Sequence, residues 1–296
     1  MSTASSSPLL SPEFLARLER LELVTRKIFR GRLKGERRSP RKGQSVEFAD
    51  YRSYVPGDDL RFIDWNTYAR LDRLFLKMFL EEEDLHFYAL VDASPSMDFG
   101  APTKLEYAKR VAAALGFIAL VRSDRVKIET LGQARRQAVA LRGRHNLWRM
   151  LDLISTIEPK EPTSLARGVK DFCIRNTGKG IVVLLTDLLD KEGFDEALRY
   201  LAARDLDVYV IHVLSAEELE PTLAGDLRLV DSEDRGIAEI TISTPLLRRY
   251  RQTLDAFVAS ARDYCNRRGM VYLLASNELP FEELVTGYLR KRGLVR

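Results

Sequence analysis

The sequence predicts an α/β protein whose main part is a doubly wound, mostly parallel sheet, preceded by a smaller β-rich N-terminal region. Two observations lead to this prediction. From residue 85 onward, short apolar segments alternate with helical segments, a rhythm typical of a parallel sheet covered on both faces. Before residue 85, aromatic and charged residues alternate around Pro56 and Gly57, a pair that presets a tight turn.

The first 42 residues contain little of the expected core. Residues 1–13 are rich in Ser and lack the basic-then-apolar order of a signal peptide, so we expect a disordered lead. Leu15, Leu18 and Leu21 fall on a helical repeat that predicts a helix over 14–28. Residues 26–42 hold nine Lys or Arg and a single acid, and their glycines and proline predict a basic loop. We therefore assign 14–42 to a helix and a basic loop.

Residues 43–84 form a block in which aromatics and charges are interleaved, and we expect a β-rich region here. We expect Tyr51, Tyr54, Phe62 and Trp65 to form a small apolar core. The density of charge around that core suggests an ion-pair network or a docking face for a partner. The candidate partner-binding residues are Arg52, Asp58, Asp59, Arg61, Asp64 and Trp65.

Residues 85–296 are predicted to form the main domain. The predicted strands are 85–91, 125–131, 181–185, 207–214 and 270–274, and the predicted helices are 104–121, 146–157, 164–174, 193–203, 245–267 and 281–291. Thr103 and Glu106 have the spacing of a capping box at the start of the first of these helices. A polar, Gly-ended segment near residue 233 predicts a hairpin inserted at about 226–242.

The segment Asp92-x-Ser94-x-Ser96 directly follows an apolar strand and is the sharpest chemical feature of the chain. Thr163 precedes a predicted helix, and Asp187 follows another strand. The carboxyl ends of parallel strands meet at one edge of the sheet, where ligands bind. Carboxylate and hydroxyl oxygens suit a divalent cation, most naturally Mg²⁺, with Mn²⁺ or Ca²⁺ as further candidates. Alternatively, the same residues only cap helices.

These five residues resemble, in type and order, the metal-ion-dependent adhesion site of von Willebrand factor A domains. A longer block runs from Gly43 through Pro56-Gly57-Asp58-Asp59 to Ile63-Asp64-Trp65, and it is similar to the signature of the bacterial family called domain of unknown function 58. The resemblance implies a von Willebrand factor A-like fold and a partnership with a MoxR-type AAA+ ATPase in chaperone-like assembly or maturation of a client protein. Many relatives resemble membrane-anchored proteins with N-terminal spanning helices, which this chain lacks.

Other functions remain as alternatives. Asp92 could be the nucleophile of a metal-dependent phosphoester hydrolase, although Ser94 stands where haloacid-dehalogenase phosphatases carry a second Asp. No Gly-rich phosphate loop is present, and His86, His145 and His212 are scattered, so we expect no enzyme activity. Asp190 could replace Asp187 as a ligand. Nucleic-acid binding through residues 26–42 is a weaker alternative, because Phe29 is the single aromatic residue among the basic side chains.

Composition fits this interpretation. The net charge of +4 is too small to imply a polyanionic partner by itself. The two cysteines, Cys173 and Cys265, lack metal-ligand spacing, so we expect free thiols in a reducing compartment. The longest uncharged apolar run, 111–121, is far short of the roughly 20 residues that a membrane span needs. We expect a cytoplasmic protein.

Overall fold

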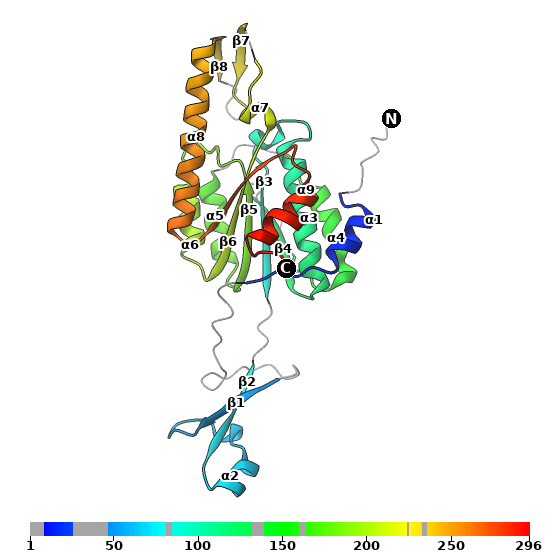
Figure 1. Cartoon of the computed structure of the whole chain (residues 1–296), viewed down its shortest axis with the longest axis vertical. Coiled ribbons are helices and arrows are strands. Elements are labelled where there is room, and N and C mark those ends of the chain that lie inside the picture. Colours follow the sequence, from blue (N-terminus) through cyan, green and yellow to red (C-terminus); the bar gives the residue numbers. More distant parts are fainter. Residues whose placement is uncertain are drawn as a thin grey trace. The chain divides into compact units, whose positions relative to one another are not determined.

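The computed structural model describes residues 9–25, 47–80, 85–131, 139–159, 164–223, 225–232 and 236–296. The chain forms two compact units (Figure 1). Unit 1 comprises Met1–Lys27 and Leu85–Arg296, and unit 2 comprises Ile28–Asp84.

The centre of unit 1 is a sheet of five parallel strands. They are β3 (His86–Asp92), β4 (Arg125–Leu131), β5 (Gly180–Thr186), β6 (Leu206–Leu214) and β9 (Val271–Ser276). Their order is β4-β3-β5-β6-β9, so the chain leaves β3 toward one edge and later returns to build the other edge outward from β5. This doubly wound topology confirms the predicted von Willebrand factor A-like fold class.

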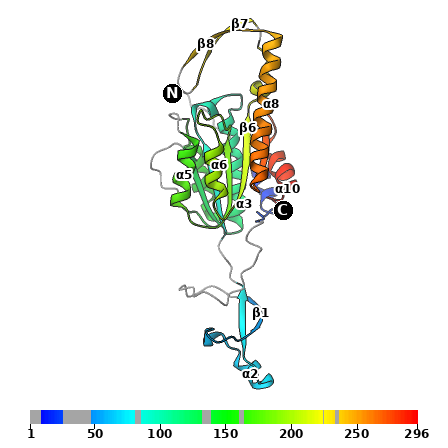
Figure 2. The same cartoon turned by 90° about the vertical axis from the view of Figure 1, so that its left-hand side faces the viewer.

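Helices cover both faces of this sheet (Figure 1 and Figure 2). One face is covered by α1 (Pro12–Leu18), α3 (Lys104–Val121), α4 (Leu147–Ser155), α9 (Phe281–Glu283), a π-helical turn (Leu284–Tyr288) and α10 (Leu289–Lys291). The other face is covered by α5 (Leu165–Arg175), α6 (Asp195–Ala202) and α8 (Thr244–Arg267). Alternate side chains of β3 and β5 enter the two cores, which explains why these strands read as continuous apolar runs.

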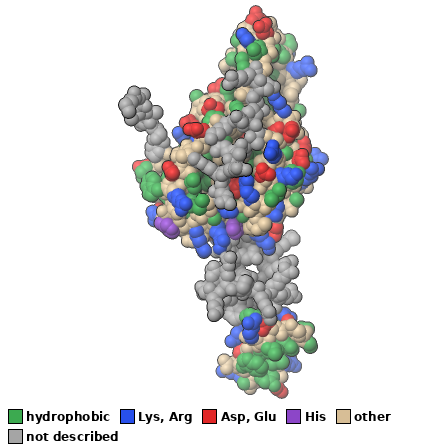
Figure 3. Space-filling model, turned by 180° about the vertical axis from the view of Figure 1, so that it is seen from behind, with side chains coloured by type: hydrophobic (Ala, Val, Ile, Leu, Met, Phe, Trp, Pro, Cys, Tyr) green, Lys and Arg blue, Asp and Glu red, His purple; other side chains and the backbone are tan. Residues whose placement is uncertain are grey.

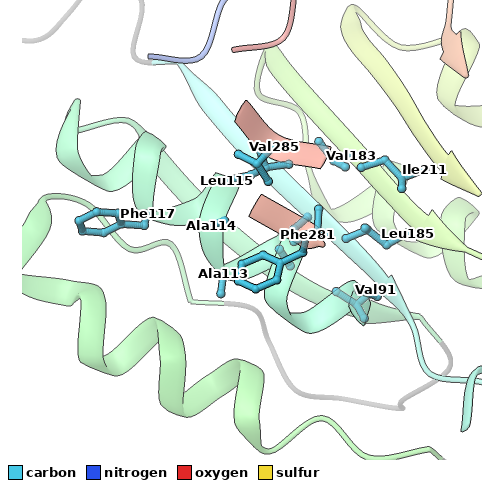
Figure 4. Close-up of a cluster of buried hydrophobic side chains, with 14 of the residues drawn as sticks. Val91, Ala113, Ala114, Leu115, Phe117, Val183, Leu185, Ile211, Phe281 and Val285 are labelled. Atoms are coloured by element: carbon cyan, nitrogen blue, oxygen red, sulfur yellow. The ribbon is translucent and has the colours of Figure 1, made fainter. Parts of the chain in front are cut away.

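The helix α3 is the most deeply buried helix of unit 1 among the described residues, and small side chains let it lie close to the sheet (Figure 4). Ala113 and Ala114 of α3 belong to the same buried cluster as Val91 of β3 and Leu185 of β5. Phe281 from the C-terminal helices lies in the same cluster. Thr103 Oγ1 accepts the backbone N–H of Glu106 at 3.1 Å, which confirms the predicted cap of α3.

The N-terminal helix is shorter than the helix predicted over 14–28. It ends at Leu18, and the chain then pairs with the C-terminus: the backbone N–H of Glu22 donates to the carbonyl of Arg296 at 3.1 Å. This non-local pairing cannot be read from a helical repeat. Leu10 is buried in the core, so order begins within the predicted disordered lead, of which residues 1–8 lie outside the described residues.

The predicted hairpin is present as β7 (Gly225–Val230) and β8 (Ile237–Ile242), an antiparallel pair. A short helix, α7 (Ala216–Leu219), precedes it after β6. The hairpin leads into α8, which runs along unit 1 from the hairpin to the far end of the sheet (Figure 2).

Unit 2 consists of the antiparallel strands β1 (Glu47–Ser53) and β2 (Phe75–Leu80), a 3₁₀ turn (Leu60–Phe62) and α2 (Trp65–Leu71). The prediction of an aromatic core was wrong, because Tyr51, Phe62 and Trp65 are exposed. Among its described hydrophobic side chains, only Ile63 and Leu76 are buried. A two-stranded sheet and a two-turn helix have too little surface to enclose four aromatic rings.

Candidate metal centre

The candidate site lies where β3 and β5 end side by side. The chain connects β3 to β4 on one side and β5 to β6 on the other, so the two strands flank the point where the winding reverses. In open α/β sheets this crevice, outside the carboxyl ends of the strands, is where ligands bind. Asp92 is the last residue of β3, and Thr186 is the last residue of β5.

The turn after β3 gathers a carboxylate and two hydroxyls. Asp92 is buried, and its Oδ1 accepts the backbone N–H of Ser94 at 3.0 Å. The Oγ atoms of Ser94 and Ser96 lie 3.0 Å apart, since a short 3₁₀ turn (Pro95–Asp98) folds the chain back. The three oxygen-bearing side chains of the Asp-x-Ser-x-Ser segment therefore lie together, as the sequence predicts.

The turn after β5 supplies the second carboxylate. Asp187 is buried, and its Oδ1 accepts the backbone N–H of Leu189 at 3.1 Å. Burial, reinforced by the charge of Asp187, raises the pKa of Asp92 to about 6. Thr186 opposes this rise, because its hydroxyl donates to Asp92 Oδ2 at 2.6 Å. A negative charge on Asp92 is therefore costly unless a cation is present.

A cavity of about 170 Å³ opens beside these side chains. Its walls include Asp92, Ser94, Thr186, Asp187, Ser164, Leu165, Leu189, Asp190, Lys191 and Glu192. Thr163 lies outside the described residues, although its neighbour Ser164 lines the cavity. Asp190 accepts the backbone N–H groups of Leu165 and Glu192, at 2.5 and 2.8 Å, so it fastens the start of α5 to this loop.

The residues present fit a small, hard cation. Two carboxylates and two hydroxyls converge, and Mg²⁺ characteristically takes one or two carboxylates and keeps several waters. Among the described residues, no cluster of three or more His, Cys, Asp or Glu side chains is placed to hold a metal ion.

Sequence reasoning missed Lys104, the first residue of α3. Its ammonium is fully buried and contacts Asp187 Oδ2 at 2.8 Å and Glu218 Oε1 at 2.6 Å. Burial lowers the pKa of Lys104, but the charges of Asp187 and Glu218 outweigh burial and raise it above its ordinary value. A signal was available, because a cation is unfavourable in the first turn of a helix and needs a nearby acid.

The charged residues of the predicted docking face are paired within unit 2. Arg52 contacts Asp58 at 2.8 Å, and Arg61 contacts Asp59 at 2.6 Å. The Arg52 guanidinium holds the pKa of Asp58 below its ordinary value. The charge density of this region is therefore present as separate ion pairs.

Asp64 and Trp65 begin α2 but behave differently. Asp64 Oδ1 accepts the backbone N–H groups of Asn66 and Thr67, and its Oδ2 accepts the hydroxyl of Tyr51 at 2.8 Å. That hydroxyl is the main reason that the pKa of Asp64 is low. The Trp65 side chain, in contrast, is 60% exposed. Of these two residues, only Trp65 is free to contact a partner without breaking α2.

Other candidates have structural roles. His212 is buried in β6 with Nδ1 2.6 Å from the Tyr272 hydroxyl, and burial lowers its pKa to about 4. Cys173 and Cys265 are free thiols, and burial raises the pKa of both. The basic segment 26–42 lies outside the described residues. Within the described part of the chain, no helix is both long and apolar enough to cross a bilayer.

Comparison with known proteins places the chain in a family. Among solved structures, it is similar to BatB from Bacteroides thetaiotaomicron (TM-score 0.41, 15% identity, 70% of this chain and 98% of that one). An aerotolerance-related membrane protein from Bacteroides fragilis is similar at a TM-score of 0.43 and 15% identity, over 70% of this chain and 99% of that one.

Sequence relatives include the uncharacterized protein Rv1480 of Mycobacterium tuberculosis, 30% identical over 242 residues, which are 79% of this chain and 76% of that protein. The family model described as "Protein of unknown function DUF58" matches residues 50–261. That match spans unit 2 from β1 onward and continues into α8 of unit 1. The signature block read from the sequence and this match agree, and the chain belongs to the DUF58 family.

Proposed function

We propose that this chain is a non-enzymatic protein-binding module whose recognition site is a divalent cation, Mg²⁺ in the cell, held at the carboxyl edge of the sheet. The observation that supports it best is the convergence of Asp92, Ser94 and Asp187 on one cavity, with the Oγ of Ser96 3.0 Å from that of Ser94. Thr163 is the further ligand that the sequence suggests. The bound cation would supply an electrophilic centre with an exchangeable position, which an acidic side chain of a partner completes.

The partner in this proposal is a MoxR-type AAA+ ATPase, and the pair acts in chaperone-like assembly or maturation of a client protein. The argument for this partner is the family resemblance carried by the signature block in unit 2. The hydrolysis of nucleotide then belongs to the ATPase, since the present sequence has no phosphate-binding loop.

Unit 2 is the proposed docking surface for that ATPase. Its exposed hydrophobic side chains include Leu60, Phe62, Trp65, Tyr68 and Leu71. Hydrophobic side chains gather on the face of unit 2 that is turned to the viewer in Figure 3. Trp65 and Tyr68 pack edge to face at 6.1 Å, which gives this surface a rigid aromatic centre of the kind that anchors interfaces.

Isothermal titration with Mg²⁺ and with Mn²⁺ tests the metal site. We expect saturable binding to the wild type, loss of binding in Asp92→Asn, and unchanged binding in Asp98→Asn, an exposed acid in the next turn. Equal binding by all three proteins would contradict the proposed site, because the ion would then bind elsewhere.

Capture of the ATPase tests the partner. A chelator is unsuitable here, because AAA+ ATPases themselves use Mg²⁺ with nucleotide. Variants of this chain avoid that difficulty. Immobilised wild type is expected to retain the ATPase, Asp92→Asn and Trp65→Ala are expected to retain less, and Asp98→Asn is the control. If Asp92→Asn retains as much ATPase as the wild type, ATPase binding does not depend on the metal site.

A further inference from the structure

Lys104 joins the candidate metal centre to the helices beyond β6. Its side chain is fully buried at the start of α3, and its ammonium lies between the carboxylates of Asp187 and Glu218. Burying an ammonium group is costly unless it is paired and hydrogen-bonded, and the positive end of a helix adds to the cost. The two carboxylates therefore hold Lys104 in place, and one of them is a candidate ligand of the metal.

Glu218 in turn fixes α7. Its Oε2 accepts the backbone N–H of Ser215 at 2.7 Å, and its own N–H donates to Ser215 Oγ at 3.1 Å, which completes a capping box. Its carbonyl accepts the hydroxyl of Tyr250 from α8 at 2.8 Å. Contacts thus run without a gap from Asp187 through Lys104 and Glu218 to α7 and α8.

We propose that Lys104 is a built-in competitor of the divalent cation for Asp187, and that metal binding shifts its ammonium toward Glu218. This inference rests on the proposed function, because it concerns the same site. An ion coordinated by Asp187 shares that carboxylate with the ammonium, and the two positive charges repel each other. Repulsion weakens metal binding and makes the Lys104–Glu218 contact depend on whether the ion is bound.

Two substitutions act in opposite directions. In Lys104→Met the competing charge is gone, so we expect Mn²⁺ to bind about tenfold more tightly, as removal of a nearby unit charge from a protein interior implies. In Glu218→Gln the ammonium keeps Asp187 as its one carboxylate partner in the described structure, so competition increases. There we expect binding about threefold weaker than that of the wild type.

The experiment is a calorimetric titration of the full chain with Mn²⁺, and again with Mg²⁺, for the wild type, both variants and Lys109→Met. Lys109 also lies on α3 but does not line the cavity, so its loss controls for removal of a lysine from this helix. A second readout is the increase in melting temperature that saturating Mn²⁺ produces in each protein. Circular dichroism verifies that each variant is folded.

Tighter binding in Lys104→Met with weaker binding in Glu218→Gln supports the proposal. Unchanged or weaker binding in a folded Lys104→Met, while the wild type binds, overturns it and leaves the metal site intact. If Lys104→Met does not fold, the Glu218→Gln variant alone tests the proposal, and an unchanged affinity in that variant overturns it.

If only Lys104→Met binds metal, competition by Lys104 is supported. If no variant binds metal and the wild type does not either, both the metal site and the competition are overturned.

Discussion

In unit 1 the strands β5 and β6 are buried throughout, whereas unit 2 buries only Ile63 and Leu76 among its described hydrophobic side chains. The first unit is held by two apolar cores, one on each face of the sheet. The second relies on turns, a helix cap and ion pairs, and it leaves Tyr51, Phe62, Trp65 and Tyr68 exposed. Because its core is well packed, unit 1 can hold the side chains of a binding site in fixed positions. Unit 2, with its exposed hydrophobic side chains, is suited to supply a contact surface.

Each unit also contains a lysine paired with an aspartate, and the two pairs differ in burial. Lys104 is fully buried beside Asp187, whereas the Lys77 side chain is 37% exposed and lies 3.3 Å from Asp64. Water screens the second pair but not the first. A Lys–Asp contact therefore contributes differently to the free energy of unfolding in the two units.

The largest expected effect concerns this pair of lysines. Lys104→Met leaves the buried carboxylate of Asp187 and the partly buried one of Glu218 without their cation, so we expect a loss of about 3–5 kcal/mol in the free energy of unfolding. Lys77→Met removes a partly exposed partner and is expected to cost less than about 1 kcal/mol. Urea denaturation of both variants, followed by circular dichroism, measures the difference. Equal losses would mean that burial does not separate the two units in this way.

The next effect compares two leucines. Leu184 is fully buried in β5, and Leu60 is exposed in unit 2. Leu184→Ala is expected to destabilise the protein by about 2–5 kcal/mol, because it leaves a cavity in a close-packed core. Leu60→Ala is expected to change stability by no more than about 0.5 kcal/mol. Thermal denaturation of the two variants checks this, and a large loss in Leu60→Ala would indicate that the surface of unit 2 is covered within the protein itself.

A smaller effect appears as a pH dependence of unit 1. Burial and the charge of Asp187 raise the pKa of Asp92 to about 6, against an unfolded value near 3.9. Between these values the native protein holds a proton that the unfolded chain has lost, so the contribution of Asp92 to stability falls as pH rises from about 4 to 6. Asn cannot ionise. The stability of Asp92→Asn minus that of the wild type is therefore expected to rise by about 2 kcal/mol over this window.

Denaturation at several pH values in the presence of a chelator measures this difference. Asp98→Asn serves as the control, because it changes an exposed acid in the next turn. A flat difference between Asp92→Asn and the wild type from pH 4 to 6 would contradict the raised pKa of Asp92.

The smallest expected effect is local to unit 2. Tyr51→Phe removes the hydroxyl that donates to Asp64, the residue that caps α2. The first amides of α2, those of Asn66 and Thr67, are expected to exchange with deuterium about threefold faster, as loss of one hydrogen bond implies. Amides of β5 in unit 1 are expected to keep their exchange rates. Faster exchange in both units would show that unit 2 and unit 1 unfold together.

Much of unit 1 could be predicted, because its information is local. The strand β5 follows from a short apolar run, and the turn after Asp92 follows from the Asp and Ser residues that form it. The parallel sheet with helices on both faces follows from the alternation of strands and helices. The end of α1 could not be predicted, because residues 22–24 pair with the C-terminus, and the helical repeat continues past that point.

The sequence by itself determined the fold class, the family and the oxygen-bearing residues that end two strands, since periodicity and motif spacing are properties of neighbouring residues. Only the tertiary structure decided that Asp92 and Asp187 line one cavity, that the pKa of Asp92 is raised, and that Lys104 lies against Asp187. It also decided that Tyr51, Phe62 and Trp65 of unit 2 are exposed. Burial and charge pairing depend on residues far apart in the chain, and folding alone brings them together.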